Sequence, residues 1–201
     1  MSELSNTPLP ANKTNGRKIL LILAAIFLLP FTIAKTMHLL NMHPTSYSYG
    51  TLVKPPQALQ LATLHDTQGK AFTAQQWQKI WSIVMVDATG CVAACQARVH
   101  LLKQVHISLN KDIKRVQRIL LVPAALNVEA YKALQQQYPD LHILVGADAE
   151  MVKFAATFNV AGQAVYLVDP LGKMMMSYPA NINPNGIQSD FKRLLKNSWA
   201  G

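Results

Sequence analysis

The feature that most constrains the fold is the stretch 82–96, SIVMVDATGCVAACQ, which holds the only two cysteines of the chain, Cys91 and Cys95. An apolar run at 83–86, rich in β-branched residues and ended by a loop of small residues, predicts a buried strand. The residues after Cys95 carry apolar side chains at helical spacing, namely Val99, Leu102 and Val105. The pair therefore lies where a strand passes into a helix, and Cys95 falls in the first helical turn. There, free N–H groups and the helix dipole favour a thiolate.

The length of 201 residues suits one domain plus an appendage, and a hydrophobic content of 50% supports a packed core. The formal net charge of +9 lies partly near the N-terminus and partly in a cluster at 111–118, KDIKRVQR. We interpret this cluster as the solvated end of a helix and its loop, with an acidic partner or lipid head groups as the alternative. No interleaving of aromatic and basic residues indicates binding of nucleic acid.

The N-terminal forty residues predict a membrane anchor. Residues 1–18 are polar and end in Arg17 and Lys18, residues 19–34 carry no charge, and the flank 35–40 extends the apolar segment. A single tilted span over 19–40 is expected, and Pro30 is acceptable in such a helix. A cleaved signal peptide and a buried soluble helix are the alternatives. Because basic residues precede the span, the tail 1–18 is expected in the cytoplasm and the remainder on the periplasmic side of the inner membrane.

Residues 41–58 contain four prolines or glycines among Ser and Tyr and predict an extended linker, so that the soluble domain covers 59–201. This domain would face an oxidising compartment. Two cysteines so close in sequence are expected to form a disulfide there unless they are reduced or bind a metal.

Strands and helices are expected to alternate along the domain. A hairpin turning near Gln68 and Gly69 is followed by a short helix capped by Thr73. Strands are predicted over 81–88, 118–122, 141–145, 164–169 and 173–178. Helices are predicted from the cysteine loop to about Leu109 and over 128–138, 149–158 and 187–197. This order predicts an α/β fold in which helices flank a mixed sheet, and the cysteine pair at a helix start makes it thioredoxin-like.

The C-x-x-x-C spacing allows several kinds of chemistry. Two sulfurs four positions apart can bond if their Cα atoms lie within about 7 Å, which a turn permits. Two thiolates also suit Cu(I), whereas a Zn²⁺ site needs further protein ligands that the sequence does not offer. A purely structural disulfide closing so small a loop would add little stability. The spacing therefore favours a functional thiol pair.

Three features resemble one known family: the N-terminal anchor, the segment 90–95, GCVAAC, and the segment 166–172, YLVDPLG. The chain from about Leu59 to Leu195 resembles the Sco/SenC/PrrC proteins, and within them a divergent branch of cytochrome oxidase-associated transmembrane proteins. This resemblance implies a thioredoxin-like domain that acts in cytochrome c oxidase biogenesis. Its partner would be the copper-site subunit of the oxidase or another assembly factor.

The chain departs from the family at two places. Gln96 stands where the family has proline, and residues 160–163, VAGQ, stand where the family has a copper-ligating histidine. Met176 is the candidate replacement, because the hairpin after 170–172 is expected to bring it roughly level with Val165 and a thioether binds Cu(I). The alternative is that the methionines at 174–176 fill the core or face solvent. His100, one helical turn beyond Cys95, is interpreted as a surface residue, with tuning of a thiolate as the alternative.

Two mechanisms remain open for the cysteines. In the first, Cys91, at the exposed end of the loop, attacks a partner disulfide and Cys95 resolves the mixed disulfide. In the second, Cys91, Cys95 and Met176 or a partner side chain bind Cu(I). An assembly scaffold with a structural disulfide is the rival of another class. A peroxidase is disfavoured, because the motif that would accompany Thr89 and Arg98 is missing.

Overall fold

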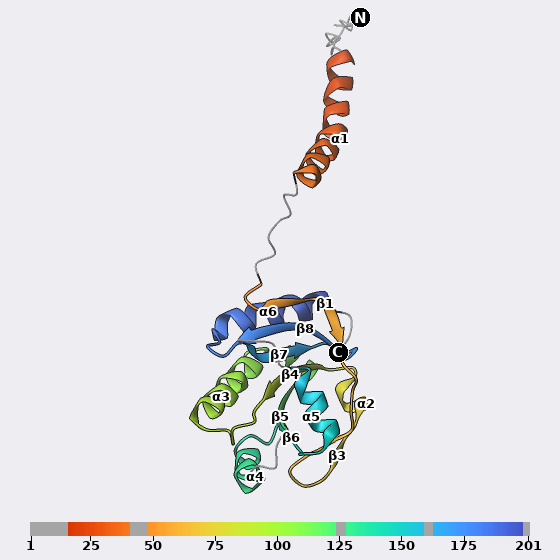
Figure 1. The fold of residues 1–201 in the computed structure, drawn as a ribbon. Helices are drawn as coiled ribbons and strands as arrows, with labels where there is room; N and C mark the ends of the chain where they lie inside the picture. The colour runs from red at the N-terminus through yellow and green to blue at the C-terminus, as the bar shows by residue number, and fades with distance from the viewer. Residues whose placement is uncertain (1–15, 41–47, 124–127, 159–162, 199–201) are drawn as a thin grey trace, which may run out of the picture. The chain divides into compact units, whose positions relative to one another are not determined.

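The structure is a computed structural model that describes residues 16–40, 48–123, 128–158 and 163–198. The chain divides into two compact units, Met1–Tyr47 and Ser48–Gly201 (Figure 1). Each unit has its own structure and is described by itself.

The first unit contains helix α1 (Gly16–Leu39), in which no residue is buried. Its apolar side chains, among them Leu20, Phe27 and Phe31, are exposed, and its most apolar window has a mean hydropathy of 2.3. A helix of 24 residues is about 36 Å long, which is enough to cross a bilayer. By length and composition, α1 is the one helix among the described residues that can span a membrane. The predicted tail lies mostly outside the described residues.

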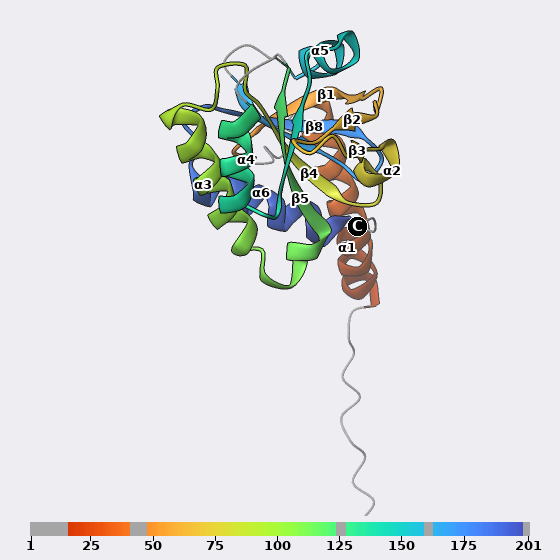
Figure 2. The same ribbon diagram turned by 90° about the horizontal axis from the view of Figure 1, so that it is seen from below.

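The second unit is built on a six-stranded mixed sheet in the order β1-β8-β7-β4-β5-β6. The strands β4, β5 and β6 are parallel, whereas β7, β8 and β1 continue the sheet in antiparallel pairs (labelled in Figure 1; Figure 2 gives the view from below). The strands are β1 (Thr51–Ala58), β4 (Trp81–Val86), β5 (Val116–Val122), β6 (Leu141–Val145), β7 (Gln163–Val168) and β8 (Lys173–Pro179).

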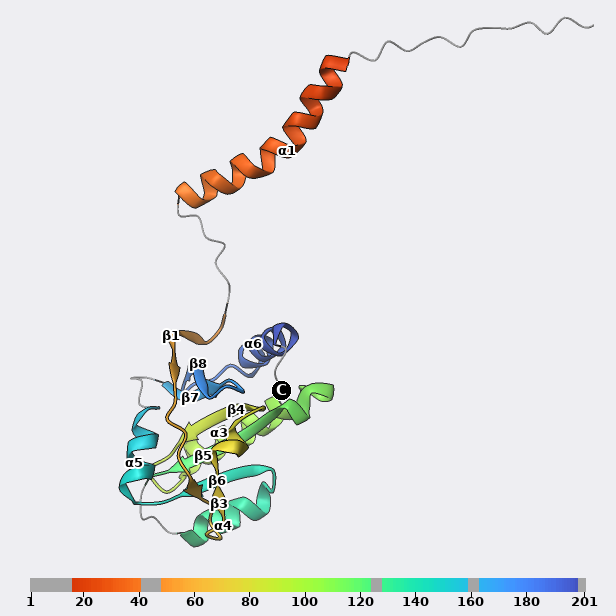
Figure 3. The same cartoon turned by 90° about the vertical axis from the view of Figure 1, so that its right-hand side faces the viewer.

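Helices cover both faces of this sheet (Figure 3). One face packs against α3 (Ala93–Ile107), α4 (Val128–Gln137) and α6 (Pro184–Asn197). The other face packs against α2 (Ala74–Trp77), α5 (Ala149–Ala156) and the hairpin of β2 (Leu64–His65) and β3 (Ala71–Phe72). A 3-10 helix, η1 (Asn110–Arg115), connects α3 to β5. The predicted α/β, thioredoxin-like arrangement is confirmed.

Central strand β4 shows why the sequence folds in this way. Ile83 and Met85 point to the α3 side of the sheet, whereas Val84 points to the α5 side, and all three are fully buried. A parallel strand with helices on both faces needs apolar residues at every position, so its sequence reads as a continuous apolar run. Burial of β4 fixes the position of the loop that follows it.

Residues 51–58 differ from the sequence prediction, because they form β1 rather than part of a linker. The strand pairs with β8 at the edge of the sheet, with Leu52 opposite Met176 and Gln57 opposite Met174. In the sequence, Pro55 and Pro56 predict a linker. An edge strand nevertheless tolerates proline, because one of its sides makes no ladder hydrogen bonds. The second unit accordingly begins at Ser48 rather than near Leu59.

Candidate functional site

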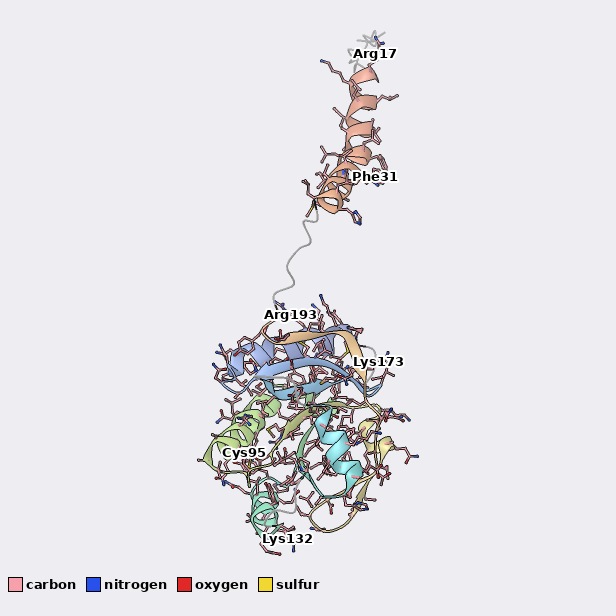
Figure 4. All side chains as sticks on the ribbon, viewed as in Figure 1. Arg17, Phe31, Cys95, Lys132, Lys173 and Arg193 are labelled. Carbon is pink, nitrogen blue, oxygen red and sulfur yellow. A yellow bond between two sulfur atoms is a disulfide. The ribbon has the colours of Figure 1, made fainter. Side chains whose placement is uncertain are left out.

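The candidate site is the loop between β4 and α3, where Cys91 and Cys95 form a disulfide with a Cα–Cα distance of 4.9 Å. Cys95 lies in the first turn of α3, and its N–H donates to the Val92 carbonyl at 2.8 Å. Figure 4 shows Cys95 at the start of α3, at the end of this helix that lies near α4. The predicted position of the pair, at the passage from a buried strand to a helix, is confirmed.

A carboxylate that the sequence analysis did not single out organises the loop. Asp87 follows β4 directly, is only 7% exposed, and accepts a hydrogen bond from the Cys91 N–H through Oδ2. The Tyr131 hydroxyl on α4 donates to the same oxygen at 2.7 Å. Oδ1 accepts from the Thr89 hydroxyl at 2.7 Å and, less closely, from the Thr89 N–H. Asp87 therefore connects the cysteine loop to the strand before it and to α4.

The backbone of the loop needs this support. Gly90 has a φ of 90° and Cys91 a φ of 47°, so both residues are in the left-handed region. Glycine adopts that region freely, but for cysteine it costs about 1–2 kcal/mol. The hydrogen bond from Cys91 N–H to Asp87 offsets part of this cost. The result is a turn tight enough to bring the two sulfurs into bonding contact.

Hydrogen bonding keeps Asp87 charged although it is buried. Burial acts to raise the pKa of this carboxyl group, but the hydrogen bonds from Thr89, Tyr131 and the Cys91 N–H outweigh burial, and its pKa lies below the ordinary value. Burial together with the hydrogen bond to Asp87 raises the pKa of Tyr131. A permanent negative charge thus lies next to the disulfide, and a neutral hydroxyl supports it.

Both sulfurs are shielded from solvent. Cys91 is 4% and Cys95 6% exposed, so the prediction of an exposed Cys91 is wrong. The left-handed turn at Cys91 and its hydrogen bond to Asp87 place this residue in the same core cluster as Cys95. The residues between the cysteines are exposed instead, and the Val92 side chain is 58% exposed. The loop offers a small apolar surface to a partner, with the sulfur atoms just below it.

The sulfurs and the carboxylate form a candidate metal group. One ligand atom each from Asp87, Cys91 and Cys95 lies within 4.8 Å of the others, and this is the one such group found among the described residues. After reduction, two neighbouring thiolates fit Cu(I) well, whereas a carboxylate is a hard ligand that fits it poorly. Asp87 is also occupied by its own hydrogen bonds. The pair of thiolates is therefore the part of the group that suits copper.

Met176 belongs to the same buried cluster as the cysteines, and the Tyr178 hydroxyl donates to its Sδ at 3.6 Å. The predicted register is wrong by two residues, because Met176 pairs with Leu167 while Val165 pairs with Tyr178. Next to the turn the strands pair about Leu171, with Val168 opposite Met174, and the irregularity between Leu167 and Val168 shifts the register by one more residue. The ligand role of Met176 stays a prediction.

His100, which was considered from sequence, and two further histidines of the domain have other contacts. His100 is exposed on α3 and bonds Gln104 at 3.0 Å, as expected for a surface residue. His106 is buried and bonds the backbone carbonyl of Val116 at 2.8 Å. His142 is exposed but packs against Phe72 on the other face of the sheet, and this partial desolvation lowers its pKa. The stretch 160–162, where the resembling family has its histidine, lies outside the described residues.

A comparison with known families matches residues 81–198 to the family described as a transmembrane-like, thioredoxin-like, C-terminal domain. These residues are more than half of the chain and include the whole candidate site. A comparison with curated proteins finds no match.

Solved structures of Sco proteins are similar to the second unit. Bradyrhizobium japonicum ScoI with copper bound is 21% identical, with a TM-score of 0.55 over 68% of this chain and 98% of that one. Yeast Sco1 with copper bound is 19% identical, with a TM-score of 0.62 over 71% and 95%. BsSco, described as a cytochrome c oxidase assembly protein with a disulfide switch, is 19% identical, with a TM-score of 0.55 over 72% and 96%. At such identities the likeness establishes the thioredoxin-like fold.

Proposed function

We propose that this chain, which belongs to the family of transmembrane-like, thioredoxin-like C-terminal domains, is a membrane-anchored thiol–disulfide exchange factor in cytochrome c oxidase biogenesis. One observation carries the proposal: Cys91 and Cys95 are close enough to bond and lie on a rigid strand-to-helix junction. A purely structural disulfide would be of little use here, because the cysteines are only four positions apart in sequence and the entropic gain grows with loop length.

The reaction runs from the reduced chain to an oxidised partner. Once a partner displaces the loop that covers the buried sulfurs, the Cys91 thiolate attacks one sulfur of the partner's disulfide, and the other partner sulfur leaves and takes up a proton. The Cys95 thiolate then attacks Cys91, which forms the observed disulfide and releases the second partner sulfur as a thiol. Two electrons and two protons have passed to the partner. A dithiol reductant from outside the chain must reduce Cys91 and Cys95 again before the next cycle.

Asp87 makes the chain a better electron donor. Its charge opposes the build-up of negative charge on the sulfurs after reduction, because like charges at short distance repel. Its hydrogen bond to Cys91 also holds the loop in the conformation that the disulfide requires. Both effects favour the disulfide over the dithiol, so the dithiol form gives up its electrons readily.

The relatives and the anchor support a proposal for the partner and the location. Sco proteins are described as cytochrome c oxidase assembly proteins, and several were solved with copper bound. The partner of this chain is therefore the copper-site subunit of the oxidase or another assembly factor, whose cysteines must be reduced before they can bind copper. With α1 in the inner membrane and basic residues before it, the thioredoxin-like domain faces the periplasm.

A second candidate function is Cu(I) delivery, and the sulfur–sulfur–carboxylate group supports it. Here copper is the cargo, held by the thiolates of Cys91 and Cys95 and completed by Met176 or by a partner side chain. Met176 lies in the same buried cluster as both cysteines. The same cysteines serve either function, so exchange and delivery can alternate on one site.

The test uses the full chain in detergent and the oxidised copper-site domain of an oxidase. The reduced chain is expected to reduce that domain, and Cys95→Ser is expected to accumulate a mixed disulfide through Cys91. Cys91→Ser should accumulate none. If Cys91→Ser gives the mixed disulfide instead, the roles of the two cysteines are exchanged.

A double variant with serine at both positions separates thiol chemistry from scaffolding. We expect it to abolish oxidase assembly in cells although the fold is kept. If assembly continues unchanged, the chain acts as a scaffold and the exchange function is wrong. A Cu(I) titration against a competing chelator, with wild type beside Cys91→Ser, decides whether the same site also carries copper.

A further inference from the structure

We propose that a basic surface formed by η1 and α6 binds the anionic head groups of the membrane that holds α1. This basic surface consists of Lys111, Lys114, Lys192, Arg193 and Lys196. The inference rests on the proposed membrane anchoring but not on the cysteine chemistry. It gives the thioredoxin-like domain a preferred side toward the bilayer.

Positive charge is concentrated on these two elements. Together they carry six basic residues and two acidic ones, Asp112 and Asp190. Asp112 is neutralised by an ion pair with Arg115 at 3.1 Å, and Asp190 is only 4% exposed. The five side chains of the basic surface all project into solvent. The net positive field of this face is therefore strong, while acidic residues such as Glu129 and Glu150 lie on other helices.

Arg115 builds the two elements into one rigid face. Its guanidinium group donates to the Leu195 carbonyl and to the Ser198 carbonyl, both at 3.1 Å, and so joins η1 to the end of α6. A hollow of about 520 Å³ lies between them, and Lys111, Lys192 and Lys196 are among its lining residues. Lysine ammonium groups around a solvent-filled hollow suit a phosphate, which each of them binds as a point charge.

The first described residues after the anchor, Tyr49 and Gly50 among them, contact α6. The N–H groups of Tyr49 and Gly50 donate to the buried carboxylate of Asp190 on α6, at 3.2 and 2.8 Å. The Tyr49 hydroxyl accepts from the N–H of Asn183, the N-cap of α6. Figures 1 and 4 show the start of β1 next to α6, with Arg193 on that side of the domain. The first described residues of the second unit are thus fixed to the helix that carries three of the five basic side chains.

The length of the tether favours lipid as the occupant. Only residues 40–47 separate the end of α1 from Ser48, and eight residues reach at most about 30 Å. Anionic head groups are then present at a high effective concentration for any surface near Ser48. Clusters of lysine and arginine close to a membrane-spanning helix bind anionic lipid by electrostatic attraction. An acidic protein would have to compete with these lipid head groups for the basic surface.

The experiment places the full chain in lipid nanodiscs made of phosphatidylcholine, with or without phosphatidylglycerol, and measures acetylation rates of individual lysines by mass spectrometry. We expect phosphatidylglycerol to slow acetylation of Lys111, Lys192 and Lys196 about threefold or more. Lys153 on α5 and Lys173 on β8 are matched exposed controls, and their rates should not change. High salt should remove the protection, because it screens surface charge.

Several results would overturn the proposal. One is equal acetylation in the two lipids, and another is protection that extends to Lys153 and Lys173. Equal protection by soluble inorganic phosphate would show an anion site without a membrane role. A variant with Lys111→Glu, Lys192→Glu and Lys196→Glu should lose the salt-sensitive association of the domain with phosphatidylglycerol, monitored at Lys114, but keep thiol exchange. The double cysteine-to-serine variant should keep the protection, which separates failure here from failure of the exchange function.

Discussion

Replacement of Asp87 by asparagine is expected to make the disulfide easier to reduce. The amide has nearly the same shape, and its oxygen can still accept from Cys91 N–H and from Tyr131. Its NH₂ group can donate to the Thr89 hydroxyl. The substitution therefore removes the negative charge while keeping most of the hydrogen bonds that shape the loop.

The size of the effect follows from the distance between charge and sulfur. A carboxylate and a thiolate no more than 4.8 Å apart repel each other by at least about 3.5 kcal/mol at an effective dielectric constant of about 20. Only part of this acts on the equilibrium, because a reduced cysteine can remain protonated. A net effect of about 1–2 kcal/mol corresponds to a reduction potential higher by about 20–45 mV.

The assay equilibrates the protein with thiol buffers of known potential, traps free thiols by alkylation and counts them by mass. Asp148→Asn is the matched control, since Asp148 also accepts a backbone hydrogen bond, from Met151, but lies at the start of α5. Asp87→Ala should destabilise the fold by about 2–5 kcal/mol in denaturant titrations, because the Cys91 N–H and the Tyr131 hydroxyl lose their acceptor. An unchanged or lower potential in Asp87→Asn would refute the electrostatic argument.

Three further outcomes are expected. Asp140→Asn should lower the free energy of unfolding by about 1–2 kcal/mol near neutral pH, because Asp140 pairs at 2.6 Å with the fully buried Arg118 but is itself half exposed. Burial acts to raise the pKa of Asp140 and the pairing with Arg118 outweighs it, so this stabilisation is complete above about pH 4 and is lost as pH falls through the lowered folded pKa. Met176→Leu should cost less than about 1.5 kcal/mol by thermal denaturation yet weaken Cu(I) binding in a chelator competition, if the thioether is a ligand. Gly50→Ala should lower the melting temperature, with a cost of about 1–3 kcal/mol, because its Cβ would overlap the ring of Tyr178.

Each of these has a contrary result. A wild-type and Asp140→Asn difference that does not shrink as the pH falls below about 4 and the wild type takes up its proton would exclude the ion pair as its origin. Unchanged Cu(I) affinity in Met176→Leu would make Met176 a core residue only. Gly50→Ala without loss of stability would mean that β1 is not held against β8 as described.

The fold was largely predictable because its core strands are continuous apolar runs. The run before the cysteines and the stretch 141–145 became β4 and β6 with little change in their bounds. The edge strand β1 was not predictable, because Pro55 and Pro56 carry a local signal for a linker. Only its pairing with β8, a contact between distant parts of the chain, makes it a strand.

The reactive cysteines of the site were predictable from the sequence, but the hydrogen bonds of Asp87 that hold their loop were not. Cys91 and Cys95 stand out because they are the only cysteines and lie close together, whereas Asp87 is one of ten acidic residues. A signal for Asp87 was nevertheless present: an aspartate at the end of a strand, followed by Ala-Thr-Gly, is typical of a side chain that accepts hydrogen bonds from the turn after it. The hydrogen bond between Asp87 and Tyr131 joins residues 44 positions apart, and a local sequence pattern cannot predict such a contact.

The burial of both sulfurs has a kinetic consequence. Small thiols in solution meet the apolar cover formed around Val92 rather than the disulfide itself, so they should react slowly even when reduction is thermodynamically favourable. A protein that contacts this cover and displaces the loop would reach the sulfurs at once. The rate would then be decided by recognition rather than by driving force. The protein could hold its oxidation state against the surrounding thiol pool and change it only in the presence of a partner with a matching surface.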